Sequence, residues 1–204
     1  MAEAFRLLEQ ADRGHAMTLR RSLRDGTGEL HSRLDRLVER NGHFDSLEGY
    51  SRWLIAMHAF YGETALALSN LEADDIVDQQ AWTARLCRLS ADLTDLSATI
   101  PPPPAETDLE IHDEVDALGL LYVTEGASLG ARLLVRRVRA LGCSENYGAR
   151  HLSAEARGNA AWQRISAIFE ARELDSEASA RLVSMSRRVF SLAAASLGDR
   201  HDDP

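Results

Sequence analysis

Residues 119–131 of the chain read GLLYVTEGASLGA, an apolar stretch that carries three glycines. Gly119, Gly126 and Gly130 would share one face of a helix, because their spacings of seven and four follow the helical repeat. Each glycine inside a helix costs about 0.8–1.0 kcal/mol relative to alanine. A stripe without side chains lets another group approach the backbone closely. That group is either a neighbouring helix or a flat ligand, with a bend of the helix between Gly126 and Gly130.

Helical spacing of apolar residues dominates the rest of the chain. It predicts helices over residues 18–40, 47–70, 76–97, 108–141, 153–171 and 175–197. The helix that carries the three glycines should begin at residues 107–110, which form a capping-box pattern, and end at Gly142. We find no apolar alternation with a period of two, so we expect an all-α fold.

Four consecutive prolines, residues 101–104, interrupt these helices. They cannot continue a helix and should form an extended loop. Neither half of the chain has an obvious closed core by itself. We therefore expect one helical domain over residues 17–198, with an N-terminal extension at 1–16 and a C-terminal tail at 199–204.

The composition limits the classes of function. The chain has 204 residues and a net charge of −9, which argues against non-specific binding of nucleic acid. No apolar run reaches the roughly 18 residues of a membrane span, and residues 1–16 lack the apolar core of a secretory signal. The two cysteines, Cys87 and Cys143, form no disulfide framework. We expect a cytoplasmic protein that binds neither membrane nor nucleic acid.

A second stretch, LRDGTGELHSRLD at residues 23–35, contains the candidate metal ligand. On a helix, His31 shares its face with Arg24, Thr27 and Asp35. Asp35 could accept a hydrogen bond from the imidazole Nδ1 and leave Nε2 free for a metal. Arg24 could pair with an anionic group of the same ligand. The simpler alternative is a histidine that only neighbours a carboxylate.

Together the two stretches suit a five-coordinate haem, with a histidine on one side and bare backbone on the other. Both also closely resemble the haem oxygenase family, in particular the bacterial branch found beside bacteriophytochromes. The resemblance covers roughly residues 17–197. It implies a haem oxygenase-like helical bundle that binds haem and opens it oxidatively to biliverdin, with release of carbon monoxide and ferrous iron.

The resemblance also implies roles for individual residues. His31 matches the haem-ligating histidine, Arg24 a basic position that contacts a propionate, and Asp35 an acidic position that hydrogen-bonds the histidine. Gly126 and Gly130 match glycines that pack on the haem and direct the reaction to one edge of the macrocycle. The expected haem-binding set is His31, Arg24, Thr27, Asp35, Tyr122, Val123, Gly126 and Gly130.

The chain has neither a dinucleotide-binding fingerprint nor a set of iron–sulfur cysteines. The resemblance therefore implies an external electron donor, a ferredoxin or a reductase. It also suggests a bacteriophytochrome as the acceptor of biliverdin.

Departures from the family pattern keep a non-catalytic haem carrier or sensor open as an alternative. Ala131 replaces the second of two adjacent glycines, and Ala127 replaces an aspartate that organises water in one branch of the family. A second propionate contact has only candidates: Arg164, Arg187 and Arg188. A di-iron oxidase or a thiaminase-like enzyme is a more distant alternative, because the chain contains no Glu-x-x-His pair.

Several other polar residues are expected to have ordinary roles. Five histidines lie in polar contexts and should be solvated: His15, His43, His112, His151 and His201. Glu63 and Glu125 should be polar core or rim residues. The cluster Arg132, Arg136, Arg137 and Arg139 could attract propionates or a redox partner, although a solvated helix face is the simpler interpretation.

Overall fold

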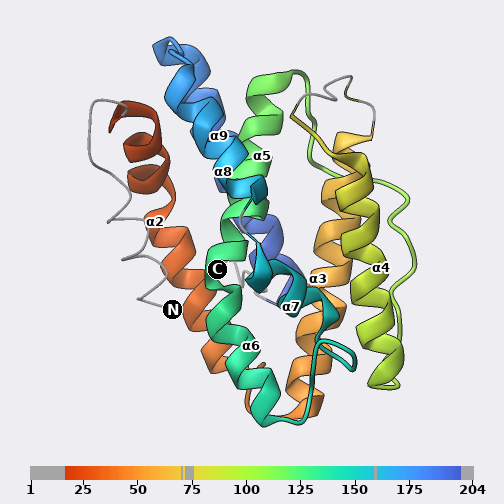
Figure 1. Cartoon of the computed structure of the whole chain (residues 1–204). Coiled ribbons are helices and arrows are strands. Elements are labelled where there is room, and N and C mark those ends of the chain that lie inside the picture. The colour runs from red at the N-terminus through yellow and green to blue at the C-terminus, as the bar shows by residue number, and fades with distance from the viewer. Residues whose placement is uncertain (1–16, 70, 72–75, 159, 199–204) are drawn as a thin grey trace, which may run out of the picture.

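A computed structural model describes residues 17–69, 71, 76–158 and 160–198. In these residues the fold is all-α, as predicted, and the only extended pairings are isolated bridges near Ser144. The elements are α2 (Met17–Arg40), α3 (Leu47–Leu68), α4 (Gln79–Asp95), α5 (Glu114–Gly126), the 3-10 turn η1 (Ala127–Gly130), α6 (Ala131–Ala140), α7 (Arg150–Arg157), α8 (Ala160–Ala171) and α9 (Ser176–Ser196) (Figure 1). The expected extension 1–16 and tail 199–204 lie outside the described residues.

Two predicted helix boundaries are wrong. The helix predicted from residue 108 begins at Glu114, because the Asp113 carboxylate accepts hydrogen bonds from the backbone N–H groups of Val115 and Asp116. The Thr107 hydroxyl instead accepts from the backbone N–H of Leu109 in the preceding loop. The helix predicted over 153–171 is divided into α7 and α8, with an extended backbone at Gly158.

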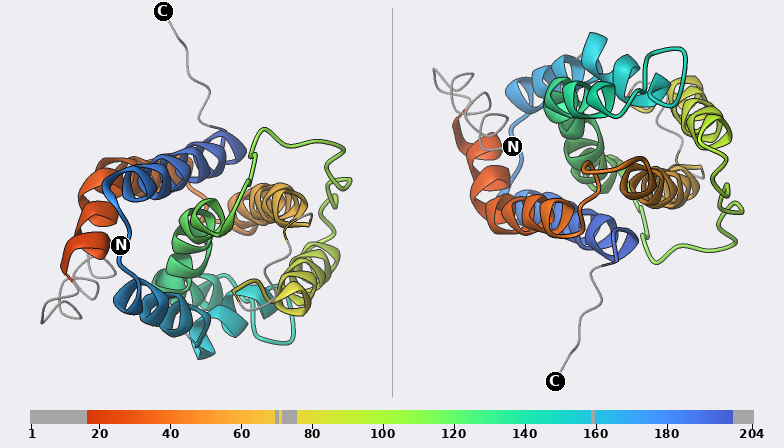
Figure 2. Two further views of the ribbon diagram at one scale, coloured as in Figure 1. Left: turned by 90° about the horizontal axis from the view of Figure 1, so that it is seen from above. Right: turned by 90° about the horizontal axis from the view of Figure 1, so that it is seen from below.

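Helix α9 supports the two helices that carry the motifs of the sequence. Both α2 and α5 pack along it, while α3 pairs with α4, and α6 pairs with α7. Figure 2 shows α5 near the middle of the bundle, with α2 and α9 on one side and α3 and α4 on the other. The long apolar core runs through all of these helices.

Glycines set the closeness of both contacts with α9. A Cβ on Gly26 of α2 would lie 2.5 Å from Val183 Cγ1. A Cβ on Gly119 of α5 would lie 2.8 Å from the Leu182 carbonyl oxygen and 2.9 Å from Met185 Cβ. Gly119 therefore serves helix packing, which was one of the two interpretations of the glycine stripe.

The segment Glu114–Ala140 is the one described stretch that is long and apolar enough to cross a membrane by composition. Within the fold, 61% of its apolar window is buried. Its length and apolar character match its place in the middle of the bundle, where it packs against other helices.

Two of the histidines expected to be solvated are buried. His43 is 4% exposed and His151 is 2% exposed. The backbone N–H groups of Arg150 and His151, at the start of α7, donate to the two oxygens of the buried Asp92 carboxylate at 2.8 and 2.9 Å. This contact draws the start of α7, and His151 with it, into the core. Burial, together with the charges of Arg85 and Arg88, holds the pKa of His151 well below its usual value.

Gly119→Ala should destabilise the fold by about 1–3 kcal/mol, because the added methyl group meets a backbone carbonyl that cannot move aside easily. Urea denaturation measures the loss. Gly130→Ala is the matched control, since a Cβ there has no neighbour within 4 Å. Equal stability of the two variants would contradict the close packing of α5 on α9.

Stability should fall with decreasing pH between pH 7.5 and 5.5, in part through His151. Its pKa is lowered in the fold, so below about pH 6.5 the unfolded chain binds a proton that the native protein does not. Each such group contributes a slope of at most about 1.4 kcal/mol per pH unit. Urea denaturation across this range should show a shallower slope for His151→Gln, whereas His112→Gln, at an exposed position, should keep the wild-type slope. An unchanged slope in His151→Gln would refute the assignment.

Candidate functional site

His31 lies on α2 with its ring between a carboxylate and an aromatic side chain. Its Nδ1 is 3.4 Å from Asp35 Oδ2, one helical turn along, as the spacing predicted. The ring meets Phe190 of α9 edge-on, with 6.0 Å between ring centroids. The His31 side chain is 27% exposed, so it is held by neighbours on two sides and still accessible.

Tyr122 connects the two sequence motifs. It belongs to α5, yet it hydrogen-bonds Thr27 of α2. Thr27 is buried, and its hydroxyl also donates to the Leu23 carbonyl at 2.7 Å. Burial raises the pKa of the Tyr122 hydroxyl, against the effects of this hydrogen bond and of the charges of Arg24 and Arg20. Four predicted positions, namely Thr27, Arg24, Tyr122 and the neighbouring buried Val123, thus lie where α2 faces α5 or directly beside it.

The three glycines of α5 and η1 have different surroundings. Gly119 packs on α9, and a Cβ on Gly126 would touch the Trp162 ring of α8 at 3.4 Å. A Cβ on Gly130 would find no atom within 4 Å. Open space beside bare backbone is therefore found at Gly130 alone among the three.

The helix changes character between Gly126 and Gly130, where the sequence predicts a bend. Here α5 gives way to the 3-10 turn η1 before α6 begins. The Ser128 hydroxyl donates to the Glu125 carbonyl at 2.7 Å. Such a local bond competes with the regular helical pattern and commonly bends a helix.

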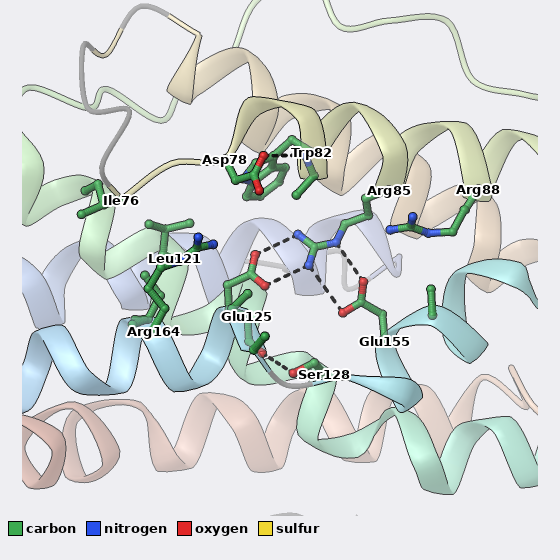
Figure 3. A pocket seen from close by; sticks show the side chains of 16 residues that line it. Ile76, Asp78, Trp82, Arg85, Arg88, Leu121, Glu125, Ser128, Glu155 and Arg164 are labelled. Atoms are coloured by element: carbon green, nitrogen blue, oxygen red, sulfur yellow. Dashed lines mark hydrogen bonds and ion pairs between the residues drawn. The ribbon is translucent and has the colours of Figure 1, made fainter.

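A buried ion cluster holds the end of α5 from the side of α4 and α7 (Figure 3). Both Arg85 terminal nitrogens, Nη1 and Nη2, donate to the two Glu125 oxygens at 3.0 Å. Its Nε and Nη2 also donate to Glu155, at 3.2 and 3.4 Å. The Arg85 guanidinium carbon lies 4.8 Å from the centre of the Tyr61 ring and 5.1 Å from that of Trp82. One arginine therefore joins α4, α5 and α7 at the residue directly before Gly126.

Arg85 and Glu155 were not among the residues predicted for the site, whereas Glu125 was expected in the polar core or at its rim. The apolar residues Trp82 and Leu89 of α4 are buried. The buried face includes Arg85, which is three residues after Trp82 and four before Leu89. A charged residue at this spacing was the available signal, because it shares the face of the two apolar residues.

Comparisons with known proteins by sequence and by structure agree on one family. The family model described as Heme oxygenase matches residues 17–197. The chain belongs to the haem oxygenase family. It is 34% identical over 155 residues to heme oxygenase PigA of Pseudomonas aeruginosa, a match that covers 74% of this chain and 77% of that protein.

A solved structure supports the same assignment. The fold matches that of the NO- and CO-bound heme oxygenase from Neisseria meningitidis with a TM-score of 0.76 and 26% identity. The match covers 91% of this chain and 95% of the other. The all-α family fold is confirmed.

The alternative of a di-iron or thiaminase-like enzyme has no support. Within the described part of the chain, no three His, Cys, Asp or Glu side chains gather closely enough to hold a metal ion.

Among the candidates for a second propionate contact, Arg187 donates to the Gly26 carbonyl at 2.7 Å and Arg188 to the carbonyl of Asp108. Arg164 is exposed and lines the pocket of Figure 3.

Arg85→Met should destabilise the protein by about 3–5 kcal/mol at pH 8, because it leaves two buried carboxylates without their cation. A buried carboxyl group without a nearby cation is more stable in its neutral form. The loss should therefore shrink as the pH falls towards 5. Urea denaturation at both pH values measures it.

Arg88→Met is the matched control for Arg85→Met, because Arg88 lies one turn further along α4 and makes no ion pair within the described residues. It should cost less at pH 8. A loss in Arg85→Met that is the same at pH 5 and pH 8 would contradict a role in neutralising the glutamates.

Proposed function

We propose that this protein binds haem through His31 and opens it oxidatively to biliverdin, with release of carbon monoxide and ferrous iron. The observation that carries the proposal is the His31–Asp35 pair, with Nδ1 at 3.4 Å from the carboxylate on a ring that stays accessible. A hydrogen bond from Nδ1–H to this carboxylate would leave Nε2 unprotonated and able to ligate iron. The family membership of the chain supports the same assignment.

The surrounding residues fit a haem. Arg24 lies close enough to Tyr122 to influence the pKa of its hydroxyl, so a cation and a phenol would be available for one propionate. Gly130 has open space where a side chain would stand, which suits a flat macrocycle against the backbone. The contact of Phe190 with the His31 ring would limit rotation of the imidazole.

Haem, when bound, supplies the iron that activates oxygen and is itself the molecule that is opened. The task of the chain is placement. Asp35 would accept a hydrogen bond from Nδ1 and so hold the orientation of the His31 ring. The buried Val123 would exclude water, and the Gly126–Gly130 segment would leave one edge of the macrocycle accessible to the reaction.

Electrons would come from an external ferredoxin or reductase. We further propose a cytoplasmic location and a bacteriophytochrome as one acceptor of biliverdin. The acceptor rests on the sequence resemblance, and a pull-down with a purified phytochrome would test it.

A non-catalytic haem carrier or sensor is the second candidate function. It is favoured by Ala127, an exposed residue without a polar side chain at a position where one branch of the family has aspartate. It would share the contacts of His31, Arg24 and Tyr122. Such a carrier or sensor would differ from an oxygenase only in that it would not convert haem to biliverdin.

Titration of the purified protein with hemin should give a saturable Soret band, followed after addition of a ferredoxin–reductase pair by its decay into the broad red band of biliverdin. His31→Ala should abolish the ligated spectrum, because no other described residue offers a carboxylate-paired imidazole on α2. Asp35→Asn should keep binding and shift the pH dependence of the spectrum. His58→Ala, a change on α3, is the control and should behave as wild type.

The outcomes separate the alternatives. A stable Soret band under reductant would favour the carrier or sensor. A normal Soret band in His31→Ala would refute the assignment of the ligand, and no band in the wild type would overturn the proposal itself.

A further inference from the structure

Three of the four arginines that follow η1 share one face of α6. Arg132, Arg136 and Arg139 are four and three residues apart, so their side chains extend to the same side of the helix. Arg137 lies on another side of α6, where it pairs with Glu39 in the last turn of α2 and with Asp45 in the loop that follows α2. The four residues that form one cluster in the sequence therefore separate in the fold.

The three arginines line a cavity of about 250 Å³ between α6 and α7, neighbours in Figure 1. Arg157 of α7 lines it as well, while Glu145 supplies its one carboxylate. That carboxylate pairs with Arg157 at 2.6 Å. The cavity is thus lined by four arginines and one acid, on a chain whose net charge is −9.

Two of these cations have no partner among the residues that the structure describes, namely Arg136 and Arg139. Arg132 donates from Nε to the Ala156 carbonyl at 3.2 Å, which holds it across the groove. The helix dipole favours Arg139 in the last turn of α6, but not Arg132 in the first turn. Stabilisation of the helix therefore does not account for this arrangement.

A buried hydroxyl gives a second, independent observation. Ser153 lines the same cavity and is 4% exposed, and its Oγ has no hydrogen-bond partner. Buried polar groups are nearly always hydrogen-bonded. Rotation about the single χ1 angle of Ser153 could bring its hydroxyl to a bound acceptor.

We propose that the α6–α7 cavity is a binding site for a phosphate-bearing anion. One guanidinium satisfies the two oxygens of a carboxylate in one plane. Several arginines that line one cavity from two helices suit instead a group with three or more oxygens in a tetrahedral arrangement. Pockets for drug-sized ligands span about 300–1,000 Å³, so this smaller cavity fits inorganic phosphate, pyrophosphate or the phosphate end of a larger molecule.

Calorimetric titration of the full chain without haem tests the site directly, with sodium pyrophosphate and inorganic phosphate at constant ionic strength. We expect saturable binding with one site per chain. Arg136→Gln with Arg139→Gln should weaken the affinity by about tenfold or more, because both unpaired cations are lost. The readout does not involve haem, so its failure is distinct from a failure of the proposed oxygenase function.

Arg21→Gln with Arg52→Gln is the matched control. It removes the same charge from exposed arginines on α2 and α3, each of which pairs with an acidic residue four positions away. Its affinity should stay within about twofold of wild type, as expected for distant, screened charges. Equal weakening in both double variants would assign the binding to overall charge and overturn the site.

Two further results would also overturn the proposal. The first is the absence of saturable binding for both phosphate and pyrophosphate. The second is tighter binding of citrate than of pyrophosphate in the same titration, which would indicate a carboxylate site.

Discussion

The backbone-level contact of α2 and α5 with α9 is the constraint on which the candidate site depends. Gly26 and Gly119 carry no side chains, so Val183 and the Leu182 carbonyl approach where a Cβ would otherwise stand. Both helices are therefore fixed to one support. His31 of α2 gains its contact with Phe190 of α9, and Tyr122 of α5 reaches Thr27 of α2. A wider separation from α9 would break these contacts together.

The far side of α5 is held by charge in addition to apolar packing. Arg85 neutralises Glu125 and Glu155 in a part of the core where its own guanidinium lies near two aromatic rings. A buried cluster of this kind is weak evidence for added stability, but removal of one partner is costly. The ion pairs of Arg85 tie Glu125, in the last turn of α5, to helices α4 and α7. That turn leads directly into η1 and the open space beside Gly130.

The glycine stripe illustrates how one sequence pattern can serve three purposes. Gly119 allows helix packing, Gly126 meets an aromatic ring, and Gly130 borders open space. All three share one helix face in the sequence pattern. In the fold that face meets α9 at Gly119 and α8 at Gly126, and it meets no neighbour at Gly130. The change to a 3-10 turn after Gly126 contributes to this difference, because it alters the direction in which the following residues point.

Local spacing predicted the all-α class, most helix positions and the His31–Asp35 pair, because these depend on residues within one or two helical turns. The start of α5 was misplaced, since Thr107 and Asp113 are both good caps and the choice between them depends on the surrounding fold. The burial of His151 and the role of Arg85 were not predictable in this way. Their partners Asp92 and Glu155 lie 59 and 70 residues away. The sequence by itself determined which groups share a helix face, whereas only the tertiary structure decided which faces meet, because those contacts join distant segments through packing.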